Sequence, residues 1–224
     1  MGKYPIFLEM GGRRAVVIGG GAVAARKAGA LLEAGARLVV VAEHIDEILG
    51  AVSRGAGVKL VKSRYEKSYL LGAAVVIAAT NNTRLNRQIH KDCQELEILC
   101  NVVDEPELCD FFVPAVVKRG DLQIAVSTEG DCPAYSGHVR KKLERIFTAK
   151  HGEFLAELEE FRKRIIREIP EPDDRKALLG NLVDDNSFEY FVANGAEKWR
   201  AFASKLVSAW CEKTTAPPPD RAEQ

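Results

Sequence analysis

The 224-residue sequence lacks an excess of either charge, because Lys and Arg total 32 and Asp and Glu also total 32. A neutral chain has no overall field that attracts nucleic acid, so we expect no nucleic-acid partner and a local group of cations for any anionic ligand. The sequence also lacks an apolar run of 18 residues, and residues 1–7 lack the basic-then-apolar order of a signal peptide. We therefore expect a cytoplasmic protein that does not bind a membrane.

Cysteine is scarce and irregularly spaced. The gaps between successive cysteines are 7, 9, 23 and 79 residues, for Cys93, Cys100, Cys109, Cys132 and Cys211. This spacing excludes a disulfide framework and a structural zinc site, and we expect no bound metal. Cys100 and Cys109 lie in apolar stretches and are predicted to be buried without a chemical role, whereas Cys132 lies in a polar turn.

The hydrophobic residues, 46% of the chain, are enough for a packed core. In the first hundred residues, apolar runs of strand length alternate with segments of helical spacing, as is typical of βαβ units. The predicted strands are Arg14–Gly19, Arg37–Ala42, Val58–Val61, Ala73–Thr80 and Ile98–Val103, and the predicted helices are Ala22–Ala34, Ile45–Arg54, Lys67–Leu71 and Thr83–Leu96. The expected fold class is therefore α/β, with a Rossmann-like doubly wound parallel sheet over residues 1–113.

The pattern of apolar residues changes in the rest of the chain. The extended run Leu122–Val126 fits a sixth strand of the sheet as well as an edge strand outside it. Helical spacing then runs from Ala134 to Arg167, with an interruption at Gly152 and a stop at the prolines that follow. Apolar core stripes are predicted at Phe154, Leu158, Phe161 and Ile165 and, in a final helix, at Trp199, Phe202, Leu206 and Trp210. We expect a helical domain over residues 148–212 and a disordered tail over residues 213–224.

A glycine-rich turn follows the first predicted strand and opens the first helix. Gly19, Gly21 and Ala24 satisfy the pattern G-x-G-x-x-A. Gly19 permits a tight turn, Gly21 lets the backbone approach a pyrophosphate, and Ala24 lets the helix pack closely on the strand. Because the free N–H groups at the start of the helix would face the phosphates, this turn predicts a dinucleotide site.

Polar residues after the second and fourth strands extend this site. Glu43 lies 22 residues after Gly21, where an acid binds the ribose hydroxyls, and His44 beside it could approach the adenosine. No Arg follows the second strand closely enough to bind a 2′-phosphate, which favours NAD over NADP. Thr80 and Asn81 are expected to line the cofactor site where the fourth strand ends.

Asp104 follows the fifth strand at its carboxyl end, beside the expected position of the nicotinamide. A carboxylate at this place is suited to general base catalysis. The same residue type is also common in turns, but no Ser-His-Asp set, HExxH helix or nucleophile elbow competes for the chemistry. Asp104 is therefore the candidate catalytic residue.

The ordered series of short motifs over residues 4 to 147 resembles the precorrin-2 dehydrogenase/sirohydrochlorin ferrochelatase family, which also forms the N-terminal module of siroheme synthase. The matching segments are Tyr4–Leu8, Val17–Gly21, Val23–Lys27, Ala78–Asn82, Asn86, Cys100–Asp104, Phe111, Pro114–Ala115, Arg119–Gly120, Ala125–Thr128 and Cys132–Pro133. The resemblance implies oxidation of precorrin-2 to sirohydrochlorin with NAD, and in some members insertion of Fe²⁺ to give sirohaem. It assigns the essential carboxylate to Asp104 and cofactor contacts to Ala22, Val23, Glu43 and His44.

The resemblance further implies a homodimer in which residues 114–147 form a dimerisation segment that exchanges strands between subunits. Leu122–Val126 would then pair with the second chain. Cations of this segment are candidates for the substrate's carboxylates, and the candidate substrate-binding residues are Arg119, Thr128, His138 and Arg140, beside Lys118, Lys141 and Lys142.

The turn Ser127–Pro133 departs from the family pattern, with Glu129 in place of a glycine and Cys132 in place of a serine. Glu129 and Asp131 add negative charge near a substrate that carries eight carboxylates, which should weaken its binding unless these side chains face away. Two other functions stay open: a chelatase whose NAD site is vestigial, and a regulatory module that senses NAD without a substrate.

Overall fold

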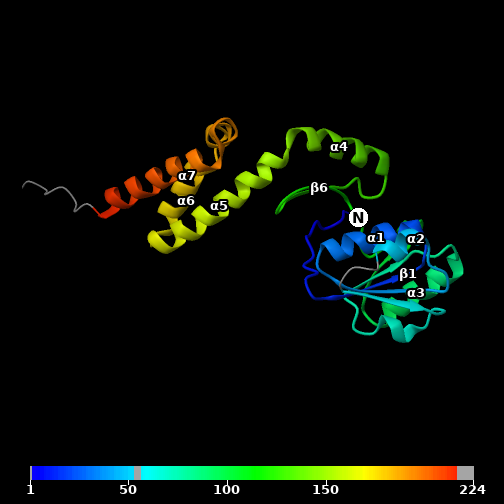
Figure 1. Cartoon of the computed structure of the whole chain (residues 1–224). Coiled ribbons are helices and arrows are strands. Elements are labelled where there is room, and N and C mark those ends of the chain that lie inside the picture. Colours follow the sequence, from blue (N-terminus) through cyan, green and yellow to red (C-terminus); the bar gives the residue numbers. More distant parts are fainter. Residues whose placement is uncertain (1, 53–56, 216–224) are drawn as a thin grey trace, which may run out of the picture. The chain divides into compact units, whose positions relative to one another are not determined.

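The structure is a computed structural model that describes residues 2–52 and 57–215 (Figure 1). The chain forms two compact units. The first runs to Val113 and also includes Glu129–Asp131, and the second comprises Pro114–Thr128 and the chain from Cys132 onward. The functional division of the sequence into a cofactor domain, a dimerisation segment and a helical domain stays a prediction.

The first unit is built on a five-stranded parallel sheet with the order β3-β2-β1-β4-β5. Its strands are β1 (Arg14–Ile18), β2 (Arg37–Ala42), β3 (Val58–Lys62), β4 (Val75–Ala78) and β5 (Leu99–Val102), and its helices are α1 (Ala22–Glu33), α2 (Glu47–Val52), α3 (Thr83–Glu95) and the short 3₁₀ turns η1 (Lys67–Leu70) and η2 (Pro106–Leu108). The chain moves outward from β1 to β3 and then returns to the other side with β4 and β5, so the direction of winding changes between β1 and β4. The predicted Rossmann-like fold is confirmed.

Residues of the central strands pack on both faces of the sheet. Alternate residues of β1 point to opposite faces, so Val17 packs in the cluster that contains Ala24 of α1, and Val16 packs in the cluster that contains Ile89 of α3. Every described residue of β4 is buried. A rigid, buried strand pair at the centre of the sheet thus fixes the position of the loops at its carboxyl edge.

Several boundaries differ from the sequence prediction. β4 and β5 are shorter than predicted at both ends, because the flanking residues belong to the loops before and after these strands. Asn82 caps α3, because its side chain accepts a hydrogen bond of 3.1 Å from the backbone N–H of Leu85.

The second unit begins with an antiparallel hairpin of β6 (Ala115–Arg119) and β7 (Leu122–Val126). The hairpin forms a sheet of its own, so the alternative of a sixth strand for Leu122–Val126 is wrong. Its neighbour β6 was not predicted, because its short apolar run follows a proline-marked loop. An exchange of strands with a second chain stays a prediction.

Four helices follow, α4 (Pro133–Ile146), α5 (Ala149–Glu168), α6 (Pro172–Leu182) and α7 (Asp185–Thr215). The helix predicted over residues 134–167 breaks at Phe147 and Thr148, not at Gly152, because Thr148 and His151 form a capping box that starts α5. The sequence pattern does not predict α6, because Pro172 ends the preceding helical spacing but occupies the first turn of a new helix. α7 contains a kink at Gly195, whose φ is 82°.

The core of these helices forms around Trp199, which is fully buried. The Trp199 ring meets Phe154 and Phe161 edge-on, and its indole N–H donates a hydrogen bond of 2.9 Å to Ser187. Phe202, predicted as a core residue of the final helix, is instead exposed. α7 continues to Thr215, so the first three residues of the predicted tail are helical, and residues 216–224 lie outside the described residues.

Candidate functional site

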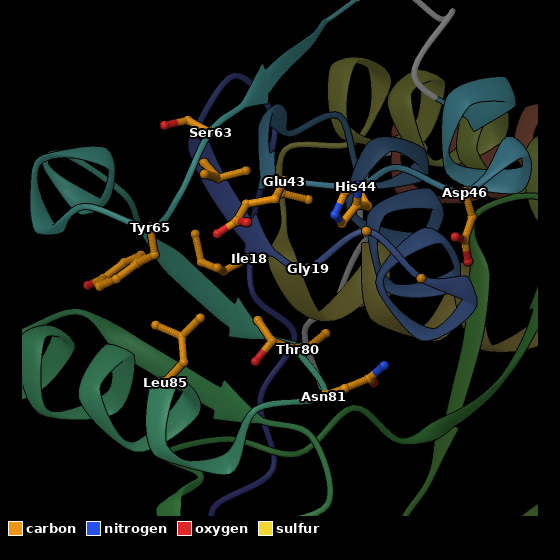
Figure 2. A pocket seen from close by; sticks show the side chains of 15 residues that line it. Ile18, Gly19, Glu43, His44, Asp46, Ser63, Tyr65, Thr80, Asn81 and Leu85 are labelled. Carbon is orange, nitrogen blue, oxygen red and sulfur yellow. The ribbon is translucent and has the colours of Figure 1, made fainter.

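A cavity of about 350 Å³ lies at the carboxyl edge of the sheet, where the winding direction changes (Figure 2). Loops after β1, β2, β3 and β4 contribute its walls. Ligands of doubly wound sheets bind at this edge, because the loops on the two sides of the switch point diverge there and leave a crevice. The cavity is therefore the candidate cofactor site.

The glycine turn after β1 has no room for side chains. A Cβ on Gly19 would lie 2.2 Å from the Ala79 carbonyl oxygen, and Gly19 has a φ of 133°. A Cβ on Gly20 would lie 1.7 Å from the His44 carbonyl oxygen. Sequence reasoning missed Gly20, which the motif leaves unspecified, although its backbone makes the closest approach. Gly21 has more space, since the nearest atom to its Cβ position is Asp46 Oδ2 at 3.7 Å.

The turn leads into the N-terminus of α1, which is suited to bind an anion. Gly21 is the cap residue and provides no side chain, and the first turn of α1 contains no acidic residue. Backbone N–H groups of the first turn are thus left for a phosphate, which fits a pyrophosphate group. Ala24 is buried against the sheet, as predicted from its size, whereas Ala22 and Val23 are exposed and do not line the cavity.

The other end of the cavity is formed by residues after β2 and β3. Glu43 and His44 line it, and Ser63 and Tyr65 of the neighbouring loop line it as well (Figure 2). The Glu43 carboxylate lies 3.4 Å from the guanidinium of Arg64. Glu43 would thus lie beside the ribose of a dinucleotide whose pyrophosphate binds to the glycine turn.

Thr80 and Asn81 also line the cavity. Their loop is held by the buried Asn86, to which the sequence analysis assigned no role. Asn86 of α3 accepts a hydrogen bond of 2.6 Å from the Thr80 hydroxyl, and its amide donates one of 3.0 Å to the Thr80 carbonyl. This pair of bonds fixes the loop after β4 against α3. An Asn one turn inside a predicted helix is the signal that could have indicated it.

Asp46 is a cavity residue that the sequence reasoning missed. Its backbone N–H donates to the Gly20 carbonyl at 2.9 Å, which places its carboxylate beside the glycine turn. A negative charge at this end opposes a pyrophosphate. No sequence motif indicates this residue, since only the folded loop brings it to the turn.

Asp104 lies at the same edge of the sheet, one strand away from the loop of Thr80. Val102 is the register partner of Ala78, so Asp104 and Thr80 each follow a paired residue by two positions. Asp104 is exposed, does not line the cavity, and has a φ of 64°. Among the described residues no hydrogen bond or ion pair involves its carboxylate, so its side chain is available to a ligand.

The residues after Asp104 are firmly held. Arg87 of α3 donates a hydrogen bond of 2.9 Å to Glu105, and the backbone N–H of Asp110 donates to the Cys100 carbonyl at 2.9 Å. A left-handed conformation in a non-glycine residue costs free energy and persists where the surroundings impose it. The fold therefore presents the Asp104 carboxylate from a fixed turn.

Burial shifts two pKa values behind this edge. Burial, and secondly the charge of Arg26, lower the pKa of Lys27 in α1, and burial raises the pKa of the Cys109 thiol. Cys100 is buried, as predicted, whereas Cys109, which was also predicted to be buried, is only partly so; Cys93 is buried and Cys132 is exposed. Both pKa shifts disfavour the charged form of the group.

The four candidate substrate-binding residues all lie in the second unit. Arg119 donates hydrogen bonds to the carbonyls of Phe147 and Glu144 at 2.7 and 3.2 Å, which satisfies the C-terminal end of α4. Arg140 forms an ion pair with Glu144. Thr128 accepts a hydrogen bond from the backbone of Cys132, and the exposed His138 ring stacks near Tyr135. Their contact with a substrate stays a prediction, and the two arginines have structural partners.

Within the described ranges, no group of three His, Cys, Asp or Glu side chains has an arrangement that would hold a metal ion. No described helix is long and apolar enough to cross a membrane.

Comparisons with known proteins relate this site to one family. Residues 6–115 match a family model described as "Putative NAD(P)-binding", and residues 119–146 match a model described as "Sirohaem biosynthesis protein central". A siroheme synthase of Pseudomonas putida (strain W619) is 39% identical over 210 residues, which cover 93% of this chain and 45% of that protein. A siroheme synthase of Psychrobacter arcticus is 38% identical over 170 residues, 76% of this chain and 31% of that protein.

The chain thus spans less than half of the length of these relatives. Among solved structures, SirC, a precorrin-2 dehydrogenase, is similar in fold, with a TM-score of 0.76 and 23% identity over 92% of this chain and all of that one.

Proposed function

The chain belongs to the family of sirohaem biosynthesis proteins in which an NAD(P)-binding domain precedes the central segment, and from this premise we propose that it oxidises precorrin-2 to sirohydrochlorin with NAD. The observation that carries the proposal is the position of Asp104 at the same edge of the sheet as the cavity, one strand away from the loop of Thr80 that lines it. An NAD site and a free carboxylate at this edge are the two groups that a dehydrogenation needs.

Different residues of the chain bind the cofactor and accept the proton. The glycine turn and the first turn of α1 bind the pyrophosphate through backbone N–H groups, and the Glu43 carboxylate accepts hydrogen bonds from the ribose hydroxyls. Bound NAD supplies the acceptor for one hydride. An Asp104 carboxylate oxygen takes the proton that leaves the substrate carbon, so that precorrin-2 and NAD⁺ give sirohydrochlorin, NADH and one proton.

Ferrous iron enters this proposal only as a substrate. The same carboxylate would accept pyrrole N–H protons when Fe²⁺ enters sirohydrochlorin, so no separate ligand cluster is needed. The dehydrogenase is the primary function that we propose, and iron insertion is a second activity to be measured in the same assay.

We place the reaction in the cytoplasm and in a homodimer. The β6–β7 hairpin supports a dimer, because it is a two-stranded sheet with Val113 and Val116 exposed on or beside it. A hairpin of two strands is marginal by itself and gains stability when a further strand pairs with its edge. Light scattering on the purified protein should give twice the mass of the chain.

The decisive experiment follows the absorption spectrum of precorrin-2 with purified protein and NAD, with and without Fe²⁺. We expect the sirohydrochlorin spectrum together with NADH. The Asp104→Asn variant should lower the rate about 10²–10⁴-fold, because the amide cannot accept the proton. Asn adopts the left-handed conformation readily, so the turn should survive the substitution.

The matched control is Glu107→Gln, which removes an exposed acid from η2 in the same loop and should keep the wild-type rate. No spectral change with authentic precorrin-2 and NAD would refute the dehydrogenase. Conversion of sirohydrochlorin with Fe²⁺ in that case would instead support a chelatase.

A further inference from the structure

Pairing of β2 with β3 brings an arginine to the ribose end of the cavity. Ala42 and Lys62 are register partners, so the residues that follow them lie side by side at the carboxyl edge of the sheet. The Nε of Arg64 lies 3.4 Å from Oε1 of Glu43, and the Arg64 side chain is 88% exposed. In the sequence the two residues are 21 positions apart, which is why no arginine was expected near Glu43.

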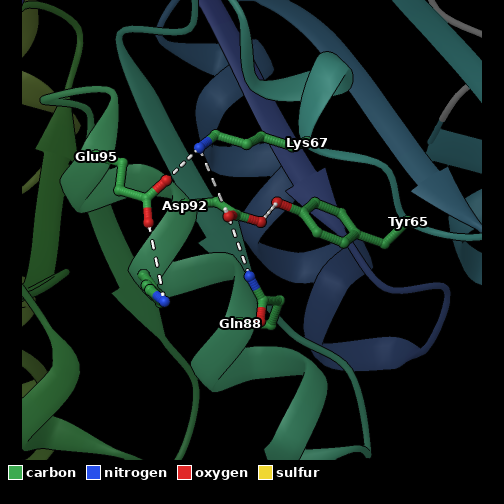
Figure 3. A network of polar contacts seen from close by, with 6 residues as sticks. Tyr65, Lys67, Gln88, Asp92 and Glu95 are labelled. Carbon is green, nitrogen blue, oxygen red and sulfur yellow. Dashed lines mark hydrogen bonds and ion pairs between the residues drawn. The ribbon is translucent and has the colours of Figure 1, made fainter.

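The loop that carries Arg64 is anchored from the other side (Figure 3). The Tyr65 hydroxyl donates a hydrogen bond of 2.7 Å to Oδ2 of Asp92, a carboxylate that is only 8% exposed. Oδ1 of Asp92 accepts a hydrogen bond of 3.0 Å from Gln88 and lies 3.8 Å from the ammonium group of Lys67. Tyr65 is thus fixed to α3.

Arg64 therefore lies between two residues, Ser63 and Tyr65, that line the cavity themselves. Its backbone cannot move away while Tyr65 is bound to Asp92, but its exposed side chain is free to change rotamer. An exposed ion pair contributes little stability, so the guanidinium can leave Glu43 for a stronger partner. A phosphate dianion is such a partner, because a guanidinium binds it with two parallel hydrogen bonds.

We propose that Arg64 determines the choice between NAD and NADP at this site, an inference that rests on the proposed function. With NAD, Arg64 stays paired with Glu43, whose carboxylate accepts the ribose hydroxyls. With NADP, Arg64 binds the 2′-phosphate and offsets its repulsion by Glu43. The ratio of the dissociation constants for NADP and NAD is then modest, because it depends on the balance between Glu43 and Arg64, which follow the adjacent strands β2 and β3.

The test is the dissociation constant of NAD and of NADP, measured by titration calorimetry for the whole chain. Wild type should bind NAD more tightly and still bind NADP measurably. Arg64→Gln should weaken NADP binding by about tenfold or more and NAD binding by less than about threefold, because only NADP carries the 2′-phosphate. Glu43→Gln should strengthen NADP binding by about tenfold, and the double variant should lose that gain because the gain needs Arg64.

Lys62→Gln is the matched control, because Lys62 is an exposed cation at the end of β3, two residues before Arg64, and does not line the cavity. It should leave the ratio of the two dissociation constants unchanged. Equal weakening of both cofactors in Arg64→Gln, or the same shift in Lys62→Gln, would overturn the proposal.

The failure of the proposed function has a different signature. NAD binding with the predicted Arg64 pattern, but no oxidation of precorrin-2, would refute the dehydrogenase and leave the role of Arg64 standing. Wild-type protein that binds neither cofactor would overturn both.

Discussion

Gly152 of α5 packs against the backbone of Arg119 at the end of β6, where a Cβ on Gly152 would lie 2.5 Å from the Arg119 carbonyl oxygen. The contact places the turn against the first residues of α5, and from there the Arg119 side chain reaches the carbonyls at the end of α4. The glycine thus joins hairpin and helices without interrupting the helix.

Gly152→Ala should therefore destabilise the protein by about 1–3 kcal/mol, because the added methyl group forces the turn away from α5. Denaturant unfolding followed by circular dichroism measures the change. Gly180→Ala is the control, since nothing lies within 4 Å of its Cβ position in α6. That substitution should stabilise by about 0.5–1 kcal/mol through helix propensity. Equal effects of the two alanines would contradict the close contact.

Tyr65→Phe should lower the free energy of unfolding by about 1–3 kcal/mol, because it leaves an oxygen of the buried Asp92 without its partner. It should also weaken NAD binding, since the loop of Ser63 and Tyr65 loses its anchor. Tyr69→Phe is the matched control, because no hydrogen bond involves the Tyr69 hydroxyl among the described residues. Similar losses in both variants would show that the phenol–carboxylate bond is unimportant.

The same bond predicts a dependence of stability on pH. Burial, and secondly the hydrogen bond to Asp92, raise the pKa of Tyr65 above its ordinary value. The neutral phenol is therefore favoured in the folded state, and its contribution is complete below the unfolded pKa of about 10 and is lost as the pH rises above it. Unfolding titrations between pH 8 and about pH 11 should show a smaller alkaline loss in Tyr65→Phe than in Tyr69→Phe.

Asp46→Asn should strengthen NAD binding about two- to tenfold, because it removes a negative charge beside the glycine turn. The gain should shrink as salt is added, since ions screen an exposed charge. Glu47→Gln removes an adjacent acid that does not line the cavity, and we expect a smaller gain from it. Calorimetric titration at two ionic strengths measures both variants. A loss of affinity in Asp46→Asn would instead assign its carboxylate to the bound cofactor.

Glu129→Gly should stabilise the protein by up to about 1 kcal/mol, because Glu129 has a φ of 55°, a conformation that favours glycine. The hydrogen bond of 2.8 Å from Lys3 to the Glu129 carbonyl involves only the backbone of residue 129 and should persist. Glu107→Gly, at a position without positive φ, should destabilise the protein. Thermal unfolding compares the two, and a lower melting temperature for Glu129→Gly would refute the expectation.

The Rossmann-like sheet and its glycine turn follow from the sequence by itself, because both depend on local patterns. Runs of Leu and Val such as Leu38–Val41 identify buried strands, and the spacing of Gly19, Gly21 and Ala24 marks the turn between strand and helix. Glu43 and Asp104 could be selected for the same reason, since each directly follows a predicted strand.

Only the tertiary structure decided which residues meet. The register of β2 and β3 brings Arg64 to Glu43, and the loop after β2 brings Asp46 to the glycine turn. Gly152 in α5 lies so close to the backbone of Arg119 that a side chain would not fit. Each of these contacts joins residues whose separation in the sequence follows neither the helical nor the strand period. Register and close backbone approach depend on how the whole core packs, so the charges around the cofactor site could not be listed until the strands were paired.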